Sequence, residues 1–191
     1  MKKNQPQRLI IGISGASGVV YGIECLKLLK QTNIESHLIV TKAALQTLKH
    51  ESSLSYEELK KLADVHYSNN DIGATIASGS FKTMGMIIAP CSIRTMSEIA
   101  SGFSASLLSR AADVVLKERR RLLLMVRETP LHAGHLQNML DLTNMGGIIM
   151  PPVPAFYSAP ESIEDIVSQT VARAMDLFEI NCDILKRWEG L

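Results

Sequence analysis

Apolar residues along this chain fall into two alternating patterns. Short runs are rich in β-branched and other apolar residues, and at 86–90 and 122–126 every position is apolar, which is typical of strands buried on both faces of a parallel sheet. Between these runs the apolar positions recur every three or four residues, which is typical of helices with one buried face. The runs predict strands at residues 9–13, 36–41, 65–67, 86–90, 122–126 and 148–150.

The segments between the runs carry signals for helix starts. Ser55 is followed three residues later by Glu58, and Ser162 by Asp165. This is the spacing of a capping box, in which a hydroxyl and an acid satisfy backbone groups at the first turn of a helix. The helix that Ser162 opens keeps the helical period over its apolar positions, and we expect it to run toward Trp188.

The alternation of strands and helices predicts the fold class. It indicates an α/β doubly wound parallel sheet with right-handed crossovers, in a single domain over residues 1–191 with a long C-terminal helix. In such sheets ligands bind beyond the carboxyl ends of the strands. The loops that follow the strands are therefore the places to look for chemistry.

Composition narrows the classes of protein. The chain has 191 residues, of which 46% are apolar, enough for one ordinary core. With 20 Lys and Arg against 19 Asp and Glu, it has no general attraction for nucleic acid or anionic membranes. Cys25, Cys91 and Cys182 are widely spaced, which fits a reducing compartment better than a disulfide framework. No run resembles a signal peptide or a membrane span, so we expect a soluble cytoplasmic protein.

The loop after the first strand, Gly12 to Gly18, is built from small residues. Small residues let backbone N–H groups approach an anion, and Ser14 and Ser17 add hydroxyls. The loop therefore predicts phosphate or nucleotide binding, and the alternative is a tight turn without a ligand. The glycine spacing is GxxGxxG, and the second strand ends in Thr41 where a dinucleotide site would carry an acid. A mononucleotide fits this pattern better than NAD.

Two further loops carry polar groups directly after apolar strands. Hydroxyl residues begin at Ser92, where they either contact a polar ligand or cap a helix. The neighbouring Cys91 has no base nearby in the sequence, so we do not assign it as a nucleophile. Arg127 and Glu128 follow the fifth strand, and this pair either binds an anion and moves a proton or forms an internal salt bridge.

Three weaker motifs remain. Arg119 to Arg121 read as a solvated end of a helix. His132 and His135 have a spacing that suits a metal, but complementary ligands are missing, so no metal site is expected. Residues 154–160 form a proline-rich, aromatic loop that either walls an apolar pocket or covers the sheet edge.

Several of these motifs together resemble the UbiX/Pad1 family of flavin prenyltransferases. The similarity extends over nearly the whole chain, with the motifs in consistent order. They are GISGASG at 12–18, APCS at 89–92, RAADV at 110–114, KERR at 117–120, RETPLH at 127–132 and PPVPAFY at 151–157.

The resemblance implies a Rossmann-like (flavodoxin-like) domain that binds FMN and assembles as a homododecamer. It implies transfer of a dimethylallyl group from dimethylallyl monophosphate to N5 and C6 of reduced FMN, without a metal. The prenylated FMN would serve a UbiD-type decarboxylase, in many bacteria on the ubiquinone route. Two alternatives stay open: a flavin-dependent decarboxylase acting directly on an aromatic or cysteinyl acid, and a non-enzymatic FMN carrier.

The same resemblance implies roles for individual residues. Trp188 would close over the site from the C-terminal segment, and Glu128 would handle a proton. Tyr157 and Arg173 would bind the prenyl phosphate. Further groups near that phosphate would be Ser17, Glu51, Arg110 and Lys117. The residues holding FMN would be Gly15, Ala16, Ser17, Thr41, Ser92, Ile93, Arg94, Thr95 and Arg127. Thr41 stands where close relatives carry Ser, which keeps the hydroxyl.

Cations at these positions fit the chemistry. Departure of an allylic phosphate leaves negative charge on the leaving group, which Arg110, Lys117 and Arg173 would stabilise in place of Mg²⁺. The prenyl unit gains cationic character, which aromatic faces such as those of Tyr157 or Trp188 stabilise.

Overall fold

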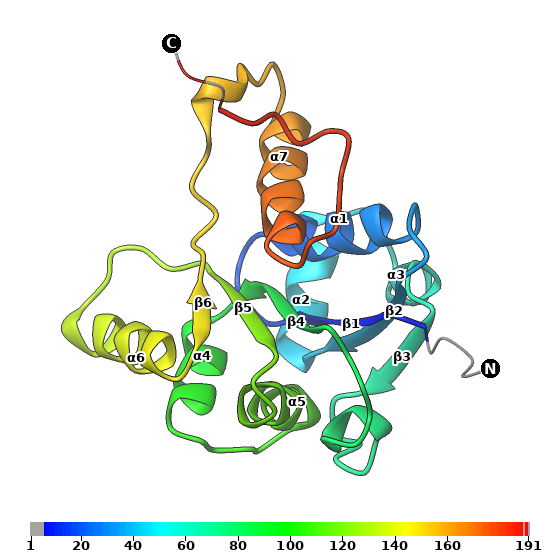
Figure 1. The fold of residues 1–191 in the computed structure, drawn as a ribbon, viewed down its shortest axis with the longest axis vertical. Helices are drawn as coiled ribbons and strands as arrows, with labels where there is room; N and C mark the ends of the chain where they lie inside the picture. The colour runs from blue at the N-terminus through cyan, green and yellow to red at the C-terminus, as the bar shows by residue number, and fades with distance from the viewer. Residues whose placement is uncertain (1–5, 189, 191) are drawn as a thin grey trace.

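All strands of the molecule join one parallel sheet. The computed structural model describes residues 6–188 and 190 (Figure 1). The strands are β1 (Arg8–Ile13), β2 (Glu35–Val40), β3 (Val65–Ser68), β4 (Gly85–Cys91), β5 (Arg121–Val126) and β6 (Gly147–Ile149). Their order across the sheet is β3-β2-β1-β4-β5-β6, and every neighbouring pair is parallel. The predicted doubly wound sheet is confirmed, with β1 and β4 flanking the point where the order reverses.

Helices cover both faces of this sheet. Both predicted capping boxes are present, Ser55 with Glu58 and Ser162 with Asp165. Each of them satisfies two groups at a helix start, a donor of the first turn and the N–H of the capping serine. The helices are α1 (Val19–Leu29), α2 (Lys42–Glu51), α3 (Tyr56–Lys61), α4 (Ile93–Ala100), α5 (Leu107–Lys117), α6 (Ala133–Asn144) and α7 (Ile163–Asp176). Short 3₁₀ turns lie at Thr75–Ala77 and Phe156–Ser158.

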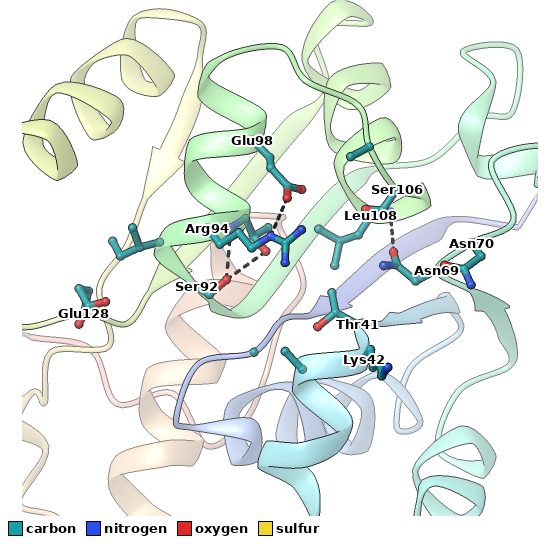
Figure 2. Close-up of a pocket in the computed structure, with 15 residues that line it drawn as sticks. Thr41, Lys42, Asn69, Asn70, Ser92, Arg94, Glu98, Ser106, Leu108 and Glu128 are labelled. Carbon is teal, nitrogen blue, oxygen red and sulfur yellow. Dashed lines mark hydrogen bonds and ion pairs between the residues drawn. The ribbon is translucent and has the colours of Figure 1, made fainter.

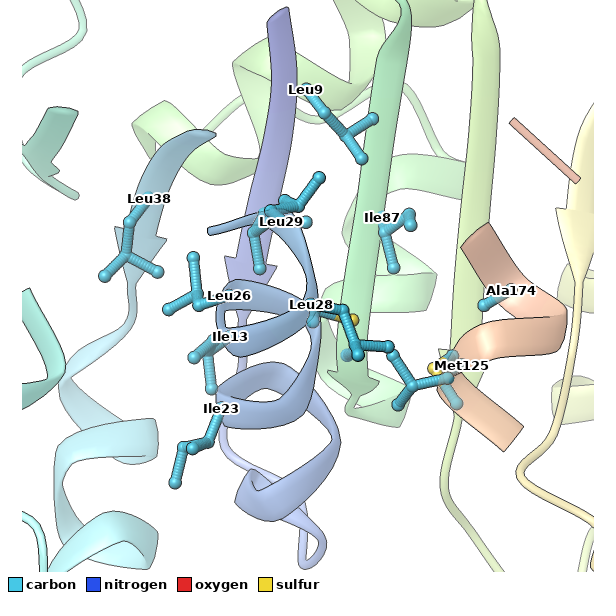
Figure 3. Packing of buried hydrophobic residues seen from close by; sticks show 14 of the residues in the cluster. Leu9, Ile13, Ile23, Leu26, Leu28, Leu29, Leu38, Ile87, Met125 and Ala174 are labelled. Atoms are coloured by element: carbon cyan, nitrogen blue, oxygen red, sulfur yellow. The ribbon is translucent and has the colours of Figure 1, made fainter. Parts of the chain in front are cut away.

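Two hydrophobic cores lie on opposite faces of the sheet. Alternate residues of one strand enter different cores: Ile87 packs under α1, α2, α3 and α7, whereas Met86 and Ile88 pack under α4 and α5. Figure 3 shows the first core, in which Leu26 of α1 and Met125 of β5 lie in the same cluster. Burying a leucine-sized side chain contributes roughly 2 kcal/mol, so these runs fix the sheet between two helical layers.

The last helix is shorter than the period predicts. α7 ends at Asp176, so the expectation that it runs toward Trp188 is wrong. Glu179 adopts a left-handed conformation (φ 62°), and residues 177–188 then return alongside α7 (Figure 1). We call residues 177–188 the C-terminal strap. Among the described residues, no helix is long and apolar enough to cross a membrane.

The interpretation of Arg119 to Arg121 as a solvated helix end is wrong for Arg121, which begins β5, and for Arg120. The guanidinium of Arg120 donates to the backbone oxygens of Gly79 (2.6 Å) and Phe81 (2.7 Å), and its side chain is only 12% exposed. Arg120 therefore satisfies the carbonyl groups of the loop that leads into β4, a structural role that a lone sequence could not distinguish from a surface charge.

Candidate functional site

A cavity of about 520 Å³ lies beyond the carboxyl ends of β1, β2 and β4, where the fold class predicts a ligand (Figure 2). Helices α2, α4 and α5 all begin around it. Its walls combine hydroxyls, amides, both signs of charge and small apolar groups. The lining residues are Gly15, Thr41, Lys42, Ala43, Asn69, Asn70, Ser92, Ile93, Arg94, Thr95, Glu98, Ala105, Ser106, Leu108 and Glu128.

Close packing of the first loop forms one wall of the cavity. A Cβ added to Gly15 would lie 2.3 Å from the Cβ of Ala43, so only glycine fits there. Ser14 is buried, and its hydroxyl donates to the carbonyl of Pro90 (3.0 Å) and accepts from the N–H of Ser92 (2.7 Å). Ser14, read from the sequence as a ligand donor, instead ties the loops after β1 and β4 together.

The carboxylate of Glu51 caps the start of α1. Glu51 accepts hydrogen bonds from the backbone N–H groups of Gly18 (2.8 Å) and Val19 (3.1 Å). Partial burial raises the pKa of Glu51, but hydrogen bonds from Ser17, Gly18 and Val19 and the charge of Arg127 outweigh it, so the pKa lies below its ordinary value. These N–H groups, which the glycine-rich loop offers to a phosphate, are already satisfied.

A second, more open hollow of about 770 Å³ adjoins the cavity. Gly15 and Ala43 line both, so the two spaces meet at this contact. Ser17 and Glu51, which the resemblance places near the prenyl phosphate, line the second hollow but not the first. Lys49 and His50 supply further polar groups there.

The hydroxyls predicted to hold a cofactor also cap helices. Thr41 Oγ1 accepts from the N–H of Ala44 (3.1 Å) at the start of α2. Ser92 Oγ accepts from the N–H of Thr95 (3.2 Å) at the start of α4. The alternative that Ser92 caps a helix is therefore confirmed. Both residues line the cavity as well, and the hydroxyl of Thr41 still has a proton to donate to a ligand.

Charged groups around the cavity differ in their partners. Arg94 pairs with Glu98 at 2.9 Å, and its side chain is 87% exposed. Among the described residues, Lys42 has no ion-pair partner and Arg127 forms no salt bridge with Glu128. The internal salt bridge that the sequence left open for this pair is therefore absent. Glu128 lines the cavity, and its Oε1 accepts from the N–H of Thr129 (3.1 Å).

Sequence reasoning missed five polar residues of the cavity wall: Lys42, Asn69, Asn70, Glu98 and Ser106. Asn69 lies in a run of turn-forming residues, and its side-chain oxygen accepts from the N–H of Leu108 (3.0 Å). Ser106 caps α5 through the N–H of Ser109. The turn-forming composition of residues 69–71 gave no indication that β3 and α5 would meet at the cavity.

Cys91 and the pair His132 and His135 do not line the cavity. Cys91 is fully buried, which raises the pKa of its thiol, so the residue is not poised as a nucleophile. The rings of His132 and His135 stack 3.6 Å apart, and Nδ1 of His132 accepts from the N–H of Gly134. Within residues 6–188, no group of three or more potential ligands gathers around them or elsewhere.

The residues predicted to bind the prenyl phosphate form a separate cluster near the C-terminal strap. The rings of Tyr157 and Trp188 meet edge to face with centroids 5.8 Å apart, and Arg173 pairs with Asp176 at 2.7 Å. Asp176 also binds Arg187 of the strap, and this hydrogen bond is the main reason that the pKa of Asp176 lies below its ordinary value. This cluster lines neither of the two hollows in a single copy.

Arg110 and Lys117 also lie outside both hollows. Arg110 pairs with Asp113 and Lys117 with Glu118, at 2.7 and 2.6 Å. Because α5 starts at the cavity and rises about 1.5 Å per residue over its 11 residues, Lys117 lies at the opposite edge of the sheet. One copy of the chain therefore does not bring the predicted phosphate cations together.

A family model described as Flavoprotein matches residues 1–175. Flavin prenyltransferase UbiX of Escherichia coli (strain K12) is 54% identical over 187 residues, covering 96% of this chain and 99% of that protein. The enzyme of the same name from Neisseria meningitidis serogroup B (strain ATCC BAA-335 / MC58) is 52% identical, covering 97% and 98%.

Solved structures show the same similarity to UbiX proteins. AnUbiX (PadA1), solved in complex with FMN and dimethylallyl pyrophosphate, superposes with a TM-score of 0.96 at 45% identity, covering 98% of this chain and 100% of that one. A dodecameric FMN-dependent UbiX-like decarboxylase from Escherichia coli O157:H7 superposes at 0.94 and 45% identity, covering 96% and 100%. The peptidyl-cysteine decarboxylase EpiD, at 17% identity and a TM-score of 0.62, shares the fold.

Proposed function

Because the chain belongs to the UbiX family of flavin prenyltransferases, we propose that it transfers a dimethylallyl group from dimethylallyl monophosphate to N5 and C6 of reduced FMN. The observation that carries this is the pair of adjoining hollows that meet at Gly15 and Ala43. A transferase with two substrates must hold both side by side with the reacting atoms in contact, and this proximity lowers the barrier.

The first cavity would hold FMN. Hydroxyls and backbone at the starts of α2 and α4 suit a polar ligand, and glycine at position 15 keeps the wall flat where a ring must approach. FMN supplies the nucleophilic ring to which the prenyl group is added. The residues that we assign to FMN are Gly15, Thr41, Ser92, Ile93, Arg94 and Thr95, which line this cavity, together with Ala16, Ser17 and Arg127, which do not.

The second hollow would admit the prenyl donor. Ser17 and Glu51 line it, and the proposed role of Ser17 is to turn the hydrogen bond that it donates to Glu51 toward the phosphate. Glu128 lies on the wall of the first cavity and would remove the proton that the flavin ring loses when the second bond forms. No metal is needed if cations stabilise the departing phosphate.

Those cations would come from several copies of the chain. Arg110 and Lys117 lie on α5 away from both hollows, and Tyr157, Arg173 and Trp188 lie around the strap. A homododecamer, the state of one solved relative, offers a way for surfaces of neighbouring copies to complete each site. In this arrangement Arg173 and Tyr157 bind the donor phosphate, while Trp188 covers the prenyl unit.

The product, prenylated FMN, would be passed to a UbiD-type decarboxylase, with ubiquinone synthesis as the pathway. We place this single-domain enzyme in the cytoplasm, and the presence of three free cysteines supports that location. We propose no nucleic-acid or membrane partner for the protein.

The test is release of inorganic phosphate from dimethylallyl monophosphate by the purified protein with reduced FMN under anaerobic conditions. Phosphate release that depends on reduced FMN supports the transferase. Absence of phosphate release, together with CO₂ formation from an aromatic or cysteinyl acid without a partner protein, would instead support a direct decarboxylase.

A further inference from the structure

The side-chain amide of Asn69 has a fixed orientation. Its oxygen accepts from the N–H of Leu108 at 3.0 Å, and its backbone carbonyl accepts from the N–H of Leu107 at 2.9 Å. Both donors belong to the first turn of α5, where backbone N–H groups lack partners inside the helix. Because the oxygen is held by α5, the amide nitrogen is turned the other way.

That nitrogen points into the cavity. Figure 2 shows Asn69 on the cavity wall, with its oxygen toward α5 and its nitrogen toward the space beside Thr41. Within the described part of the chain, Asn69 Nδ2 makes no hydrogen bond. An amide NH₂ group carries two donors, so this wall offers them to a ligand.

The end of the cavity at Asn69 favours negative charge. Lys42 lies on the same side in Figure 2, and among the described residues it has no ion-pair partner. Ser106 adds a hydroxyl at the start of α5. The opposite end carries the carboxylate of Glu128. Arg94 and Glu98, which also line the cavity, pair with each other at 2.9 Å. Coulomb interactions with Lys42 and Glu128 therefore favour an anionic group near Asn69 and away from Glu128.

The two ends of FMN also differ in charge. If the proposed function holds, the reacting edge of the flavin ring lies near Glu128, and the phosphate lies at the other end of the ribityl chain. We propose that Asn69 donates a hydrogen bond to the FMN phosphate and so sets the direction in which the cofactor lies in the cavity. Lys42 supplies the positive charge at this end of the cavity, and the hydrogen bond from Asn69 fixes the orientation of FMN.

Replacement of Asn69 by Asp tests this assignment. Asn69→Asp keeps an oxygen that accepts from Leu108 but replaces the inward donor by a negative oxygen. Asn33→Asp makes the same chemical change on an exposed turn before β2, outside the cavity. Binding of FMN and of riboflavin, which lacks the phosphate, is followed by quenching of flavin fluorescence.

We expect Asn69→Asp to weaken FMN binding by about tenfold or more, the loss that one charge-assisted hydrogen bond supplies. Riboflavin binding should change far less, and Asn33→Asp should bind both flavins like the wild type. Equal melting temperatures of Asn69→Asp and the wild type show that α5 is still capped. If Asn69→Asp melts earlier, Asn69→Ser, which also offers an oxygen to α5, is measured instead with the same expectation.

Unchanged FMN affinity in Asn69→Asp would overturn the inference while the proposed function stands. An equal loss for FMN and riboflavin would overturn the assignment to the phosphate. Failure of the wild type to bind FMN would overturn the proposed function itself, so the two results are distinguishable.

Discussion

Gln169 of α7 pairs through both ends of its side-chain amide with the backbone of Lys186. Its Nε2 donates to the carbonyl of Lys186 at 2.8 Å, and its Oε1 accepts from the N–H of Lys186 at 3.0 Å. The side chain of Gln169 is buried, so the pairing replaces water at two backbone groups. It fixes the C-terminal strap two residues before Trp188, and thus fixes where Trp188 meets Tyr157.

Gln169→Leu should release the strap without disturbing the sheet. The substitution leaves the N–H of Lys186 without its partner and removes the shorter of the two hydrogen bonds to its carbonyl, which also accepts from the hydroxyl of Tyr157 at 3.5 Å. Trp188 is the only tryptophan of the chain, so its fluorescence reports the strap directly. We expect a red-shifted emission and stronger quenching by acrylamide.

Gln137→Leu is the matched control, because this glutamine lies on the exposed face of α6 and bonds only to Asp141. Its tryptophan spectrum should match that of the wild type. A wild-type spectrum in Gln169→Leu would contradict the role of Gln169 in holding the strap.

Arg173→Ala should affect the prenyl donor more than FMN. Arg173 lines neither hollow of its own copy and is held by Asp176, where it is available to a phosphate from a neighbouring copy. Loss of a charge-assisted contact of about 1.5–3 kcal/mol predicts a roughly ten- to hundredfold rise in KM for dimethylallyl monophosphate. Titrations that show equal losses for donor and FMN would count against this assignment.

Glu128→Gln should retain FMN but slow the step that removes the ring proton. General base catalysis contributes roughly 10²–10⁴-fold, so the rate of product formation should fall within that range. Flavin fluorescence titration measures retention, and single-turnover absorbance measures the rate. Complete loss of FMN binding would mean that Glu128 has a structural role.

The carboxylate of Glu51 makes stability depend on pH in a defined direction. Because its pKa in the folded protein lies below the ordinary value of 4.5, the unfolded chain binds its proton first as pH falls. The stabilisation is therefore fully present above pH 4.5 and is lost as pH falls through the lower, folded value. Glu51→Gln lacks it at every pH.

Thermal melting from pH 7 to pH 3 checks this. Glu51→Gln should melt below the wild type at pH 7, and the difference should shrink as pH falls below 4.5. A difference that stays constant or grows toward pH 3 would show that the carboxylate charge is not what stabilises the start of α1.

Gly15→Ala should damage the wall that the two hollows share. The added methyl would stand 2.3 Å from the Cβ of Ala43, so the first loop and α2 must separate. We expect FMN affinity to fall by about tenfold or more, since the wall contacts the ligand directly. At Gly73 the same methyl meets only Asp71 Oδ1 at 3.6 Å, so Gly73→Ala should bind FMN normally. Normal FMN binding by Gly15→Ala would contradict the close packing at this wall.

The sequence predicted the sheet well because the evidence for it is local. An apolar run reflects the burial of one strand, and a capping box reflects the backbone hydrogen bonds of one helix. The strands that contain Ile87 and Leu123 coincide with two of the apolar runs. The end of α7 was missed because the helical period continues through Phe178, which packs in the first core although the helix has already ended.

The site was predictable only in part, for the same reason. Loops that follow adjacent strands meet at one edge, so Thr41, Ser92 and Glu128 could be expected to lie together. Asn69 entered the cavity through a contact with α5, more than thirty residues away, which no local pattern encodes. The role of Arg120 likewise depends on carbonyl groups about forty residues away.

Mass spectrometry of the flavin tests the central claim most directly. The purified protein is incubated anaerobically with reduced FMN and dimethylallyl monophosphate. The flavin is then released, and its molecular mass is measured. The account predicts an FMN heavier by one dimethylallyl unit, formed only when donor, reduced flavin and protein are all present. Recovery of FMN at its original mass, with the protein shown to bind both substrates, would contradict it.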